Sequence, residues 1–139
     1  MAINSTQAHD CATDLTTNDD AAILAAWERI SEARAVYDKL PDIPGLPIGD
    51  YTPAEQEQWD IIDAAEALIK DAVATTPEAT EIQLWTSLSH SVTGWDDERA
   101  ARERNLEFFL ADGCQLDWNE RFIIAAIRSL RAMQEGGAA

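Results

Sequence analysis

The sequence predicts an all-α protein, a compact bundle of about five helices joined by short loops and by one connector rich in proline and glycine. No run of residues alternates apolar and polar side chains for long enough to form a strand. Apolar side chains instead recur every three or four residues along most of the chain, and helix-start signals precede several of these segments. These observations favour a helical bundle over any fold that contains a sheet.

The first helix is expected to begin at Asn18 to Asp20, because Asx side chains cap helices and acidic groups suit the positive end of a helix. Its apolar face consists of Ile23, Ala26, Trp27, Ile30, Ala33, Tyr37 and Leu40. Residues 1–17 show no helical period and few large apolar groups, so they are interpreted as a flexible N-terminal arm.

The segment PDIPGLPIGD, residues 41–50, ends this helix because its three prolines and two glycines remove hydrogen-bond donors and favour turns. An exposed loop rarely carries so much aliphatic surface. We therefore expect Ile43, Leu46 and Ile48 to lie against the bundle, with a binding loop as the alternative.

The next two helices have similar start signals. Thr52, Pro53 and Glu55 form a capping-box pattern that opens a helix running to about Ala74. Thr75 or Thr76 then caps a third helix, with Pro77 and Glu78 in its first turn, and this helix is expected to end near Gly94.

A fourth helix is predicted from about Asp96 to Ala111, closed by Gly113 in the left-handed conformation. A fifth begins at Asp117 with Glu120 as its capping-box partner. The apolar face of the fifth helix is predicted to be Phe122, Ile123, Ala126, Ile127, Leu130 and Met133. Residues 18–135 thus make a single helical domain, and residues 136–139 are expected to fray.

The 139 residues suffice for one core, and a hydrophobic content of 46% with five Trp argues against disorder. Cys11 and Cys114 are too far apart in sequence to suggest a disulfide framework or a zinc site. Without a signal peptide pattern or a long apolar run, the chain is expected to be cytoplasmic and not to enter a membrane.

Twenty-six acidic residues against ten basic ones give a formal charge of -16. This charge disfavours direct binding to nucleic acid or anionic lipid, because phosphate contacts need Lys and Arg. Residues 41–75 hold eight acids and one base, whereas residues 118–139 hold two acids and three bases. The expected partner is therefore a basic protein or nucleoprotein complex.

Motifs for catalysis or for cofactor binding are absent from the sequence. There is no HExxH, EF-hand or paired CxxC pattern, no phosphate loop, and neither His9 nor His90 follows a Glu by three residues, as a di-iron bundle requires. For nucleophilic catalysis the chain offers Cys114 with His90, but His90 is expected beside Gln83 and Ser87, away from the core, and the serines lie in no triad-like context. We expect no metal, no cofactor and no enzyme activity, with carboxylate catalysis as a remote alternative.

The second predicted helix is the most acidic part of the chain. Residues placed every 100° put Ile61, Ile62, Ala65, Leu68, Ile69, Ala72 and Val73 on one face. Glu57, Asp60, Asp63 and Asp71 project from the other face, so they are the predicted partner-binding residues. Acids along this helix are spaced by about 5.5 Å on average, against about 3.4 Å for the phosphates of a DNA strand, so the helix alone is a dilute imitation of a strand. It imitates a strand well only if acids of residues 95–98 or of a second copy of the chain join it. A solvated face that keeps the protein soluble is the alternative.

Aromatic and aliphatic side chains outside the main apolar faces give two further candidates. Trp59 lies at the border of its helix's apolar face beside Asp60 and Asp63, as an interface anchor with an acidic rim would, and we add it to the partner-binding set. Phe108 and Ile124 mark either a second buried surface or a homodimer contact.

A short, acidic, helical chain whose most charged part is DYTPAEQEQWDIIDAAEALIKDA resembles the small proteins that bacterial viruses and prophages encode. Among these it is similar to the anti-CRISPR inhibitors in size, charge and lack of an enzyme signature. The resemblance implies an inhibitor that binds a nucleic-acid-handling complex and blocks its nucleic-acid or partner site. The alternative is a structural or adaptor module that binds through Phe108, Ile124 and the connector, with the acids only solubilising it.

Overall fold

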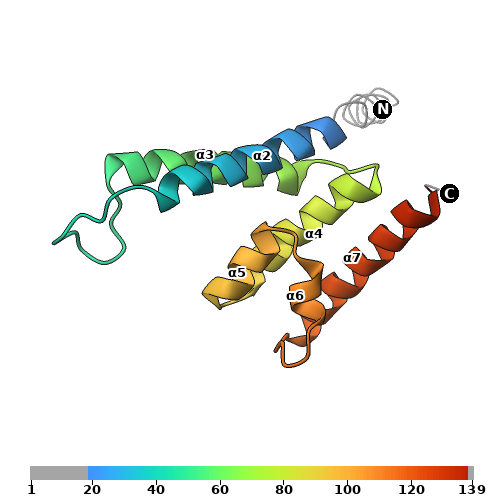
Figure 1. Ribbon diagram of the computed structural model, residues 1–139. Helices are drawn as coiled ribbons and strands as arrows, with labels where there is room; N and C mark the ends of the chain where they lie inside the picture. Colours follow the sequence, from blue (N-terminus) through green and yellow to red (C-terminus); the bar gives the residue numbers. More distant parts are fainter. Residues whose placement is uncertain (1–18, 138–139) are drawn as a thin grey trace, which may run out of the picture.

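Six helices and no strand make up residues 19–137, the part of the chain that the computed structural model describes (Figure 1). The all-α prediction is confirmed, and the predicted arm, residues 1–17, lies outside the described residues. The helices are α2 (Asp19–Asp38), α3 (Pro53–Asp71), α4 (Pro77–Ser91), α5 (Trp95–Arg102), α6 (Leu106–Leu110) and α7 (Trp118–Gly137).

The helices form two groups, and α4 belongs to both. Helices α2 and α3 make an antiparallel hairpin, while α5, α6 and α7 lie on the other side of α4 (Figure 1). The first half of α4 contributes Ala79 and Ile82 to a core shared with the hairpin. Its second half contributes Trp85 and Leu88 to a core shared with α5, α6 and α7, and Trp27 packs against both cores. Helix α4 therefore connects the α2–α3 hairpin to the group formed by α5, α6 and α7.

The predicted starts of α3, α4 and α7 are confirmed by their hydrogen bonds, whereas the predicted cap Asn18 lies outside the described residues and α5 has no side-chain cap. The Thr52 hydroxyl accepts from the Glu55 amide, and the Glu55 carboxylate accepts from the Thr52 amide, each at 3.2 Å. Asp117 and Glu120 make the same reciprocal pair at 2.8 and 2.9 Å at the start of α7. Of the two threonines proposed before α4, Thr76 is the cap.

The two acids that begin α2 have a tertiary role that their position in the sequence does not indicate. Asp19 accepts from the Val73 amide at 2.8 Å, and Asp20 accepts from the Thr75 amide at 2.7 Å and from the Thr75 hydroxyl. These bonds attach the start of α2 to the segment between α3 and α4. The hydrogen bonds from Thr75 also lower the pKa of the Asp20 carboxyl below its usual value.

The predicted fourth helix is wrong as a single element, because it breaks between Arg102 and Leu106. The Arg104 amide donates to the Ala101 carbonyl at 3.1 Å and the Asn105 amide to the Ala100 carbonyl at 2.9 Å. This pair of bonds is a Schellman motif, whose left-handed position usually holds Gly. Here Arg104 occupies it, with φ 56°, and Asn105 then caps α6.

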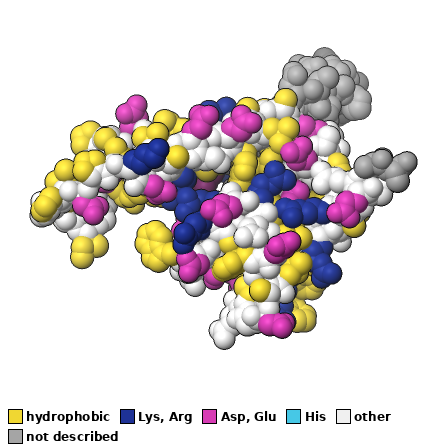
Figure 2. Space-filling model, viewed as in Figure 1, with side chains coloured by type: hydrophobic (Ala, Val, Ile, Leu, Met, Phe, Trp, Pro, Cys, Tyr) yellow, Lys and Arg dark blue, Asp and Glu magenta, His cyan; other side chains and the backbone are white. Residues whose placement is uncertain are grey.

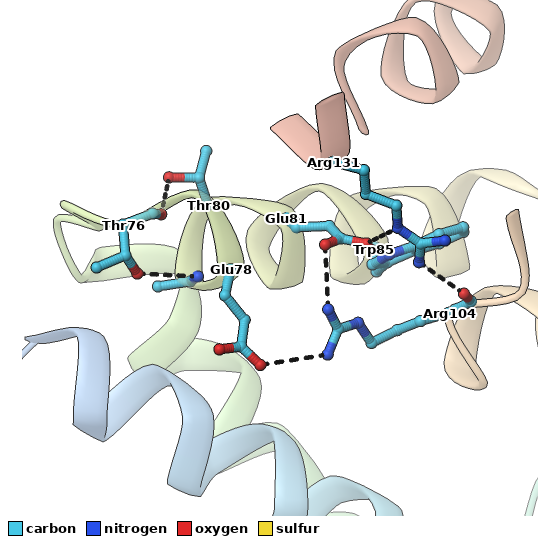
Figure 3. A network of polar contacts seen from close by, with 8 residues as sticks. Thr76, Glu78, Thr80, Glu81, Trp85, Arg104 and Arg131 are labelled. Carbon is cyan, nitrogen blue, oxygen red and sulfur yellow. Dashed lines mark hydrogen bonds and ion pairs between the residues drawn. The ribbon is translucent and has the colours of Figure 1, made fainter. Parts of the chain in front are cut away.

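The side chain of Arg104 accounts for this unusual choice, because it reaches the buried carboxylate of Glu81 on α4 (Figure 3). Glu81 is 1% exposed and accepts from Arg104 at 3.1 Å, from Arg131 at 2.7 Å and from the Trp85 indole at 2.9 Å. Arg131 also donates to the Arg104 carbonyl at 2.9 Å. We call these four residues the Glu81 network. It joins α4, the α5–α6 break and α7.

Burial alone would raise the pKa of the Glu81 carboxyl. The hydrogen bonds from Trp85 and Arg131, together with the charges of Arg104 and Arg131, more than offset burial, so the pKa of Glu81 lies below its usual value. Glu81 is therefore held as a carboxylate in the folded protein.

The connector also differs from its prediction, because all ten residues from 41 to 50 are exposed and Ile48 is wholly so. Two successive turns close the loop on itself: the Leu46 amide donates to the Ile43 carbonyl, and the Asp50 amide to the Pro47 carbonyl. Gly45 and Gly49 supply the positive φ that the third residue of a type II turn needs. Because its backbone is partly satisfied locally, the loop extends beyond the ends of α2 and α3 instead of covering them (Figure 1).

The buried face of α7 is rotated from the predicted one. Phe122 and Met133 are each 63% exposed, whereas Ile124 and Ile127 are buried. Ile124, at 5% exposed, and the half-buried Phe108 both pack in the core formed by α4, α5, α6 and α7. They therefore belong to the second buried surface, the first of the two alternatives, and an oligomer contact through them stays a prediction. Helix α7 continues to Gly137, past the predicted end of the domain at residue 135.

We predict that Glu81→Gln destabilises the protein by about 3 kcal/mol, because it removes the buried charge to which the part-buried Arg104 and Arg131 donate. Glu78→Gln is the matched control, since Glu78 is half-exposed and lies 3.8 Å from Arg104. Its loss should cost about 0.5 kcal/mol or less. Urea unfolding followed by circular dichroism measures both, and equal effects of the two substitutions would contradict the role given to the Glu81 network.

We also predict that stability falls in acid. A carboxyl whose folded-state pKa is lowered adds stability that is present above its unfolded pKa and is lost as the pH falls through its folded pKa. For Asp20 and Glu81, the free energy of unfolding should stay level down to about pH 5 and decline below about pH 4. Urea titrations across this range test the decline, and Glu81→Gln should show a shallower one. An identical slope in the variant would contradict the assignment.

Candidate protein-binding surface

The acidic helix α3 packs on α2 through a narrow stripe. Ile62, Ala65 and Ile69 are buried against the hairpin core, and Leu68 and Ala72 lie half-buried beside them. Ile61 and Val73, which the 100° placement put on the buried face, are instead exposed. The stripe is narrower than predicted because α3 contacts mainly α2 on that side, so much of its circumference faces solvent.

All four predicted acids lie on this solvent-facing side. Glu57, Asp60, Asp63 and Asp71 are exposed, and they have few partners. Asp60 accepts from the Gln56 amide at 2.9 Å, and Asp71 lies 3.7 Å from the equally exposed Lys70. Within residues 19–137, Glu57 and Asp63 make no ion pair. An exposed pair such as Lys70 with Asp71 is weak, so most of the negative charge of this face is left uncompensated.

These acids border two hollows on either side of α3. Glu57 and Asp60 line a shallow one of about 600 Å³, whose floor includes Ile61 and Ala64. Asp63 lines the second, a groove of about 700 Å³ between α3 and α4. The groove is also lined by Glu66, Lys70, Gln83, Ser87 and His90. The acids are therefore presented beside apolar depressions that another protein surface could fill.

Trp59 does not belong to this exposed surface. Its ring packs edge-on against Tyr37 with centroids 5.5 Å apart, lies 5.9 Å from the ring of Tyr51, and has the Arg34 guanidinium 4.5 Å from its centroid. Trp59 is half-buried in the hairpin core. The structure thus places Trp59 at the border of the hairpin core, mainly among packing residues, and its role as a partner-facing anchor stays a prediction.

Most of the remaining acids near α3 and on α5 are already engaged. Glu66 accepts from His90 across the groove at 2.8 Å, which leaves His90 exposed beside Gln83 and Ser87 as predicted. On α5, Glu98 pairs with Arg34 at 3.1 Å and with Arg102 at 3.7 Å, and Asp96 pairs with Arg99. Asp97 makes no ion pair within residues 19–137 and lines a hollow with Phe108 and Cys114. The two paired acids of α5 therefore add little to the negative face of α3.

The basic residues explain why the α3 face is so negative. Within residues 19–137, six of the ten Lys and Arg side chains make ion pairs: Arg34, Lys70, Arg99, Arg102, Arg104 and Arg131. Figure 2 shows several of these blue side chains gathered where the hairpin meets the α4–α7 group, with acidic side chains spread over the outer surface. Internal use of the arginines leaves few cations for the outside.

The sites that the sequence offered for chemistry are not assembled. Cys114 lines a hollow near the α6–α7 loop, while His90 lines the α3–α4 groove. Burial, with the charges of Asp97 and Glu120, raises the pKa of the Cys114 thiol, which lowers its nucleophilicity at neutral pH. No cluster of His, Cys, Asp and Glu that could hold a metal occurs in residues 19–137. Among the same residues, every helix is too short or too polar to cross a membrane.

Comparison with protein-family models, curated proteins and solved structures found no match to this chain. The surface is therefore the basis for inferring function.

We predict that Trp59→Ala lowers the stability of the protein by about 2 kcal/mol, because it removes a large side chain packed between two tyrosines and an arginine. Trp118→Ala is the matched control, since Trp118 is 73% exposed and should cost about 0.5 kcal/mol or less. Thermal melting of both variants tests this assignment. A larger loss for Trp118→Ala than for Trp59→Ala would contradict it.

Proposed function

We propose that this protein is an acidic protein-binding inhibitor or regulator that uses the exposed face of α3 to occupy a basic surface of its partner. The partner we propose is a nucleic-acid-handling protein or complex, such as a CRISPR–Cas component, in the cytoplasm of a bacterial host cell. The observation that carries the proposal is the row of uncompensated acids, Glu57, Asp60 and Asp63, on a helix whose opposite side is fixed in the core.

The support is electrostatic. Acids three residues apart on a helix are separated by about 4.5 Å along its axis, against about 3.4 Å between phosphates of one DNA strand. A basic groove that binds a nucleic-acid backbone would therefore meet a row of like charge on α3, at a lower charge density than that of DNA. A field of one sign also speeds encounter with an oppositely charged surface at low salt.

Shape supports the same use of α3. Charge complementarity mainly speeds association and orients the partner, whereas high affinity also needs buried contacts. The hollow floored by Ile61 and Ala64 lies directly beside Glu57 and Asp60, so apolar contact and charge are available in one place. Because the capping box fixes the start of α3, this surface is preorganised and loses little entropy on binding.

An adaptor module remains the second candidate, and exposure of the connector favours it. Ile43, Leu46 and Ile48 present aliphatic side chains to solvent, which a partner could bury. In that case the acids of α3 only keep the protein soluble. The two candidates differ in how binding responds to salt, since exposed charges are screened beyond roughly 8 Å at physiological ionic strength.

The proposal predicts that Asp60→Lys/Asp63→Lys weakens partner binding while helical content and melting temperature stay near those of the natural protein, because both side chains are exposed. Glu28→Lys/Glu32→Lys on the outer face of α2 is the matched control, with the same change in net charge on another exposed surface. Tagged natural protein and both variants are used to capture partners from bacterial lysate, followed by stepwise salt elution and mass spectrometry.

We expect a basic, nucleic-acid-binding protein to elute from the natural protein and from the α2 variant at moderate salt, and to be depleted in the α3 variant. Equal capture by all three proteins would reject the α3 face as the binding site. A partner retained through high salt would transfer the proposal to the adaptor candidate.

A further inference from the structure

The outer side of α7 carries large apolar side chains that no other part of the described molecule covers. Trp118 is 73% exposed and Phe122 63% exposed, and their rings meet edge to face with centroids 5.7 Å apart. Ala125, Ala132 and Met133 continue the same side of the helix and are also exposed. We call these five residues the α7 outer face. Such a continuous exposed apolar surface is typical of a protein contact.

Two arginines give this face a positive border. Arg121 and Arg128 are exposed, and neither makes an ion pair within residues 19–137. Arg121 only donates to the Leu116 carbonyl at 3.2 Å. Both arginines also line a hollow of about 380 Å³ beside Ala125, with Leu110 at its rim. The lining of the hollow is mixed, since it also includes the carboxylate of Asp112 and the apolar side chains of Phe109 and Leu116. In a chain of formal charge -16, two arginines without an ion pair beside these apolar side chains favour an acidic, aliphatic occupant.

The connector of the same chain has that chemistry. It presents Ile43, Leu46 and Ile48 with Asp42 and Asp50 near its two ends, all exposed. No basic residue occurs between Lys39 and Lys70, so its charge is not neutralised by sequence neighbours. Its two hydrogen-bonded turns hold the loop in one shape, which reduces the entropy lost when it docks.

We propose that the connector, residues 41–50, of one copy docks on the α7 outer face of a second copy, with Ile48 entering the hollow and Asp42 and Asp50 facing Arg121 and Arg128. Within one molecule the two elements lie apart, the connector beyond the hairpin and α7 at the far side of α4 (Figure 1). Contact between them therefore requires two molecules. If each of two copies docks its connector on the other, the contact closes into a dimer. If each copy docks on a different neighbour, the contact builds an open filament.

The proposal goes beyond the proposed function and uses none of the α3 acids. It is tested by sedimentation equilibrium of the purified full chain across a wide range of concentration, with no other protein present. We expect the mass to rise from 15.3 kDa to at least twice that value with increasing concentration. Asp42→Lys/Asp50→Lys and Arg121→Glu/Arg128→Glu should each weaken association by at least roughly tenfold, because each places like charges across the contact.

The decisive sample is an equimolar mixture of these two variants. In this mixture the basic connector of Asp42→Lys/Asp50→Lys faces the acidic α7 border of Arg121→Glu/Arg128→Glu. The unchanged acidic connector of Arg121→Glu/Arg128→Glu faces the unchanged basic α7 border of Asp42→Lys/Asp50→Lys. Association should return in the mixture to near the level of the natural protein. The four substituted side chains are exposed, so circular dichroism should show both variants folded. Glu28→Lys/Glu32→Lys has the same change in net charge as the connector variant and should associate as the natural protein does.

Three results would overturn the proposal. A mass of 15.3 kDa at every concentration would mean that the α7 outer face is covered by something other than a second copy. Association lost only in the α7 variant would mean that two α7 faces pair with each other. A mixture that stays monomeric, although each variant is folded, would exclude the connector as the occupant.

Discussion

The buried carboxylate of Glu81 sets the arrangement of the second half of the molecule. Taking a carboxylate out of water costs several kcal/mol unless donors and cations replace the water. Glu81 receives three donors, from Trp85 on its own helix and from Arg104 and Arg131 on distant segments (Figure 3). Arg104 can reach it because the chain turns sharply after α5, and the left-handed backbone there costs roughly 1–2 kcal/mol. The break between α5 and α6 therefore brings Arg104 to this one ionised side chain, and the docking of α7 beside α4 brings Arg131 to it.

The same internal use of arginine shapes the outside of the molecule. Arg34, Arg104 and Arg131 face carboxylates at the junctions between helices, and Arg34 also covers the Trp59 ring. Cations placed there cannot neutralise the exposed acids of α3. The local negative field over α3 is therefore stronger than the overall composition implies. This negative field arises because the arginines lie at the junctions between helices. The packing between helices thus determines how much negative charge α3 presents for binding.

Local signals in the sequence were sufficient to predict the helix starts, because a capping box involves residues three apart and depends on nothing else. The exposed acids of α3 were also predictable from the helical period. Glu81 was not, because its partners lie 23 and 50 residues away and a Glu early in a helix normally faces water. The break at Arg104 follows from Glu81, so it was hidden for the same reason. The packing of Trp59 was not predictable, because a border position on α3 does not reveal that Tyr37 of α2 and Tyr51 of the preceding loop lie against it.

The apolar surfaces left outside have a topological cause. Helix α4 is covered on both sides and so buries Ile82, Trp85 and Leu88, whereas α7 lies at the edge of the bundle and buries one side only (Figure 1). The connector leaves the hairpin at its open end, where no other helix can cover it. These two uncovered elements share no residue with the acidic face of α3. If they join two copies, each particle carries two α3 faces and twice the negative charge, and a partner with more than one basic site would then be held by both faces at once. Self-association would in that case strengthen binding through α3 without adding any contact to α3 itself.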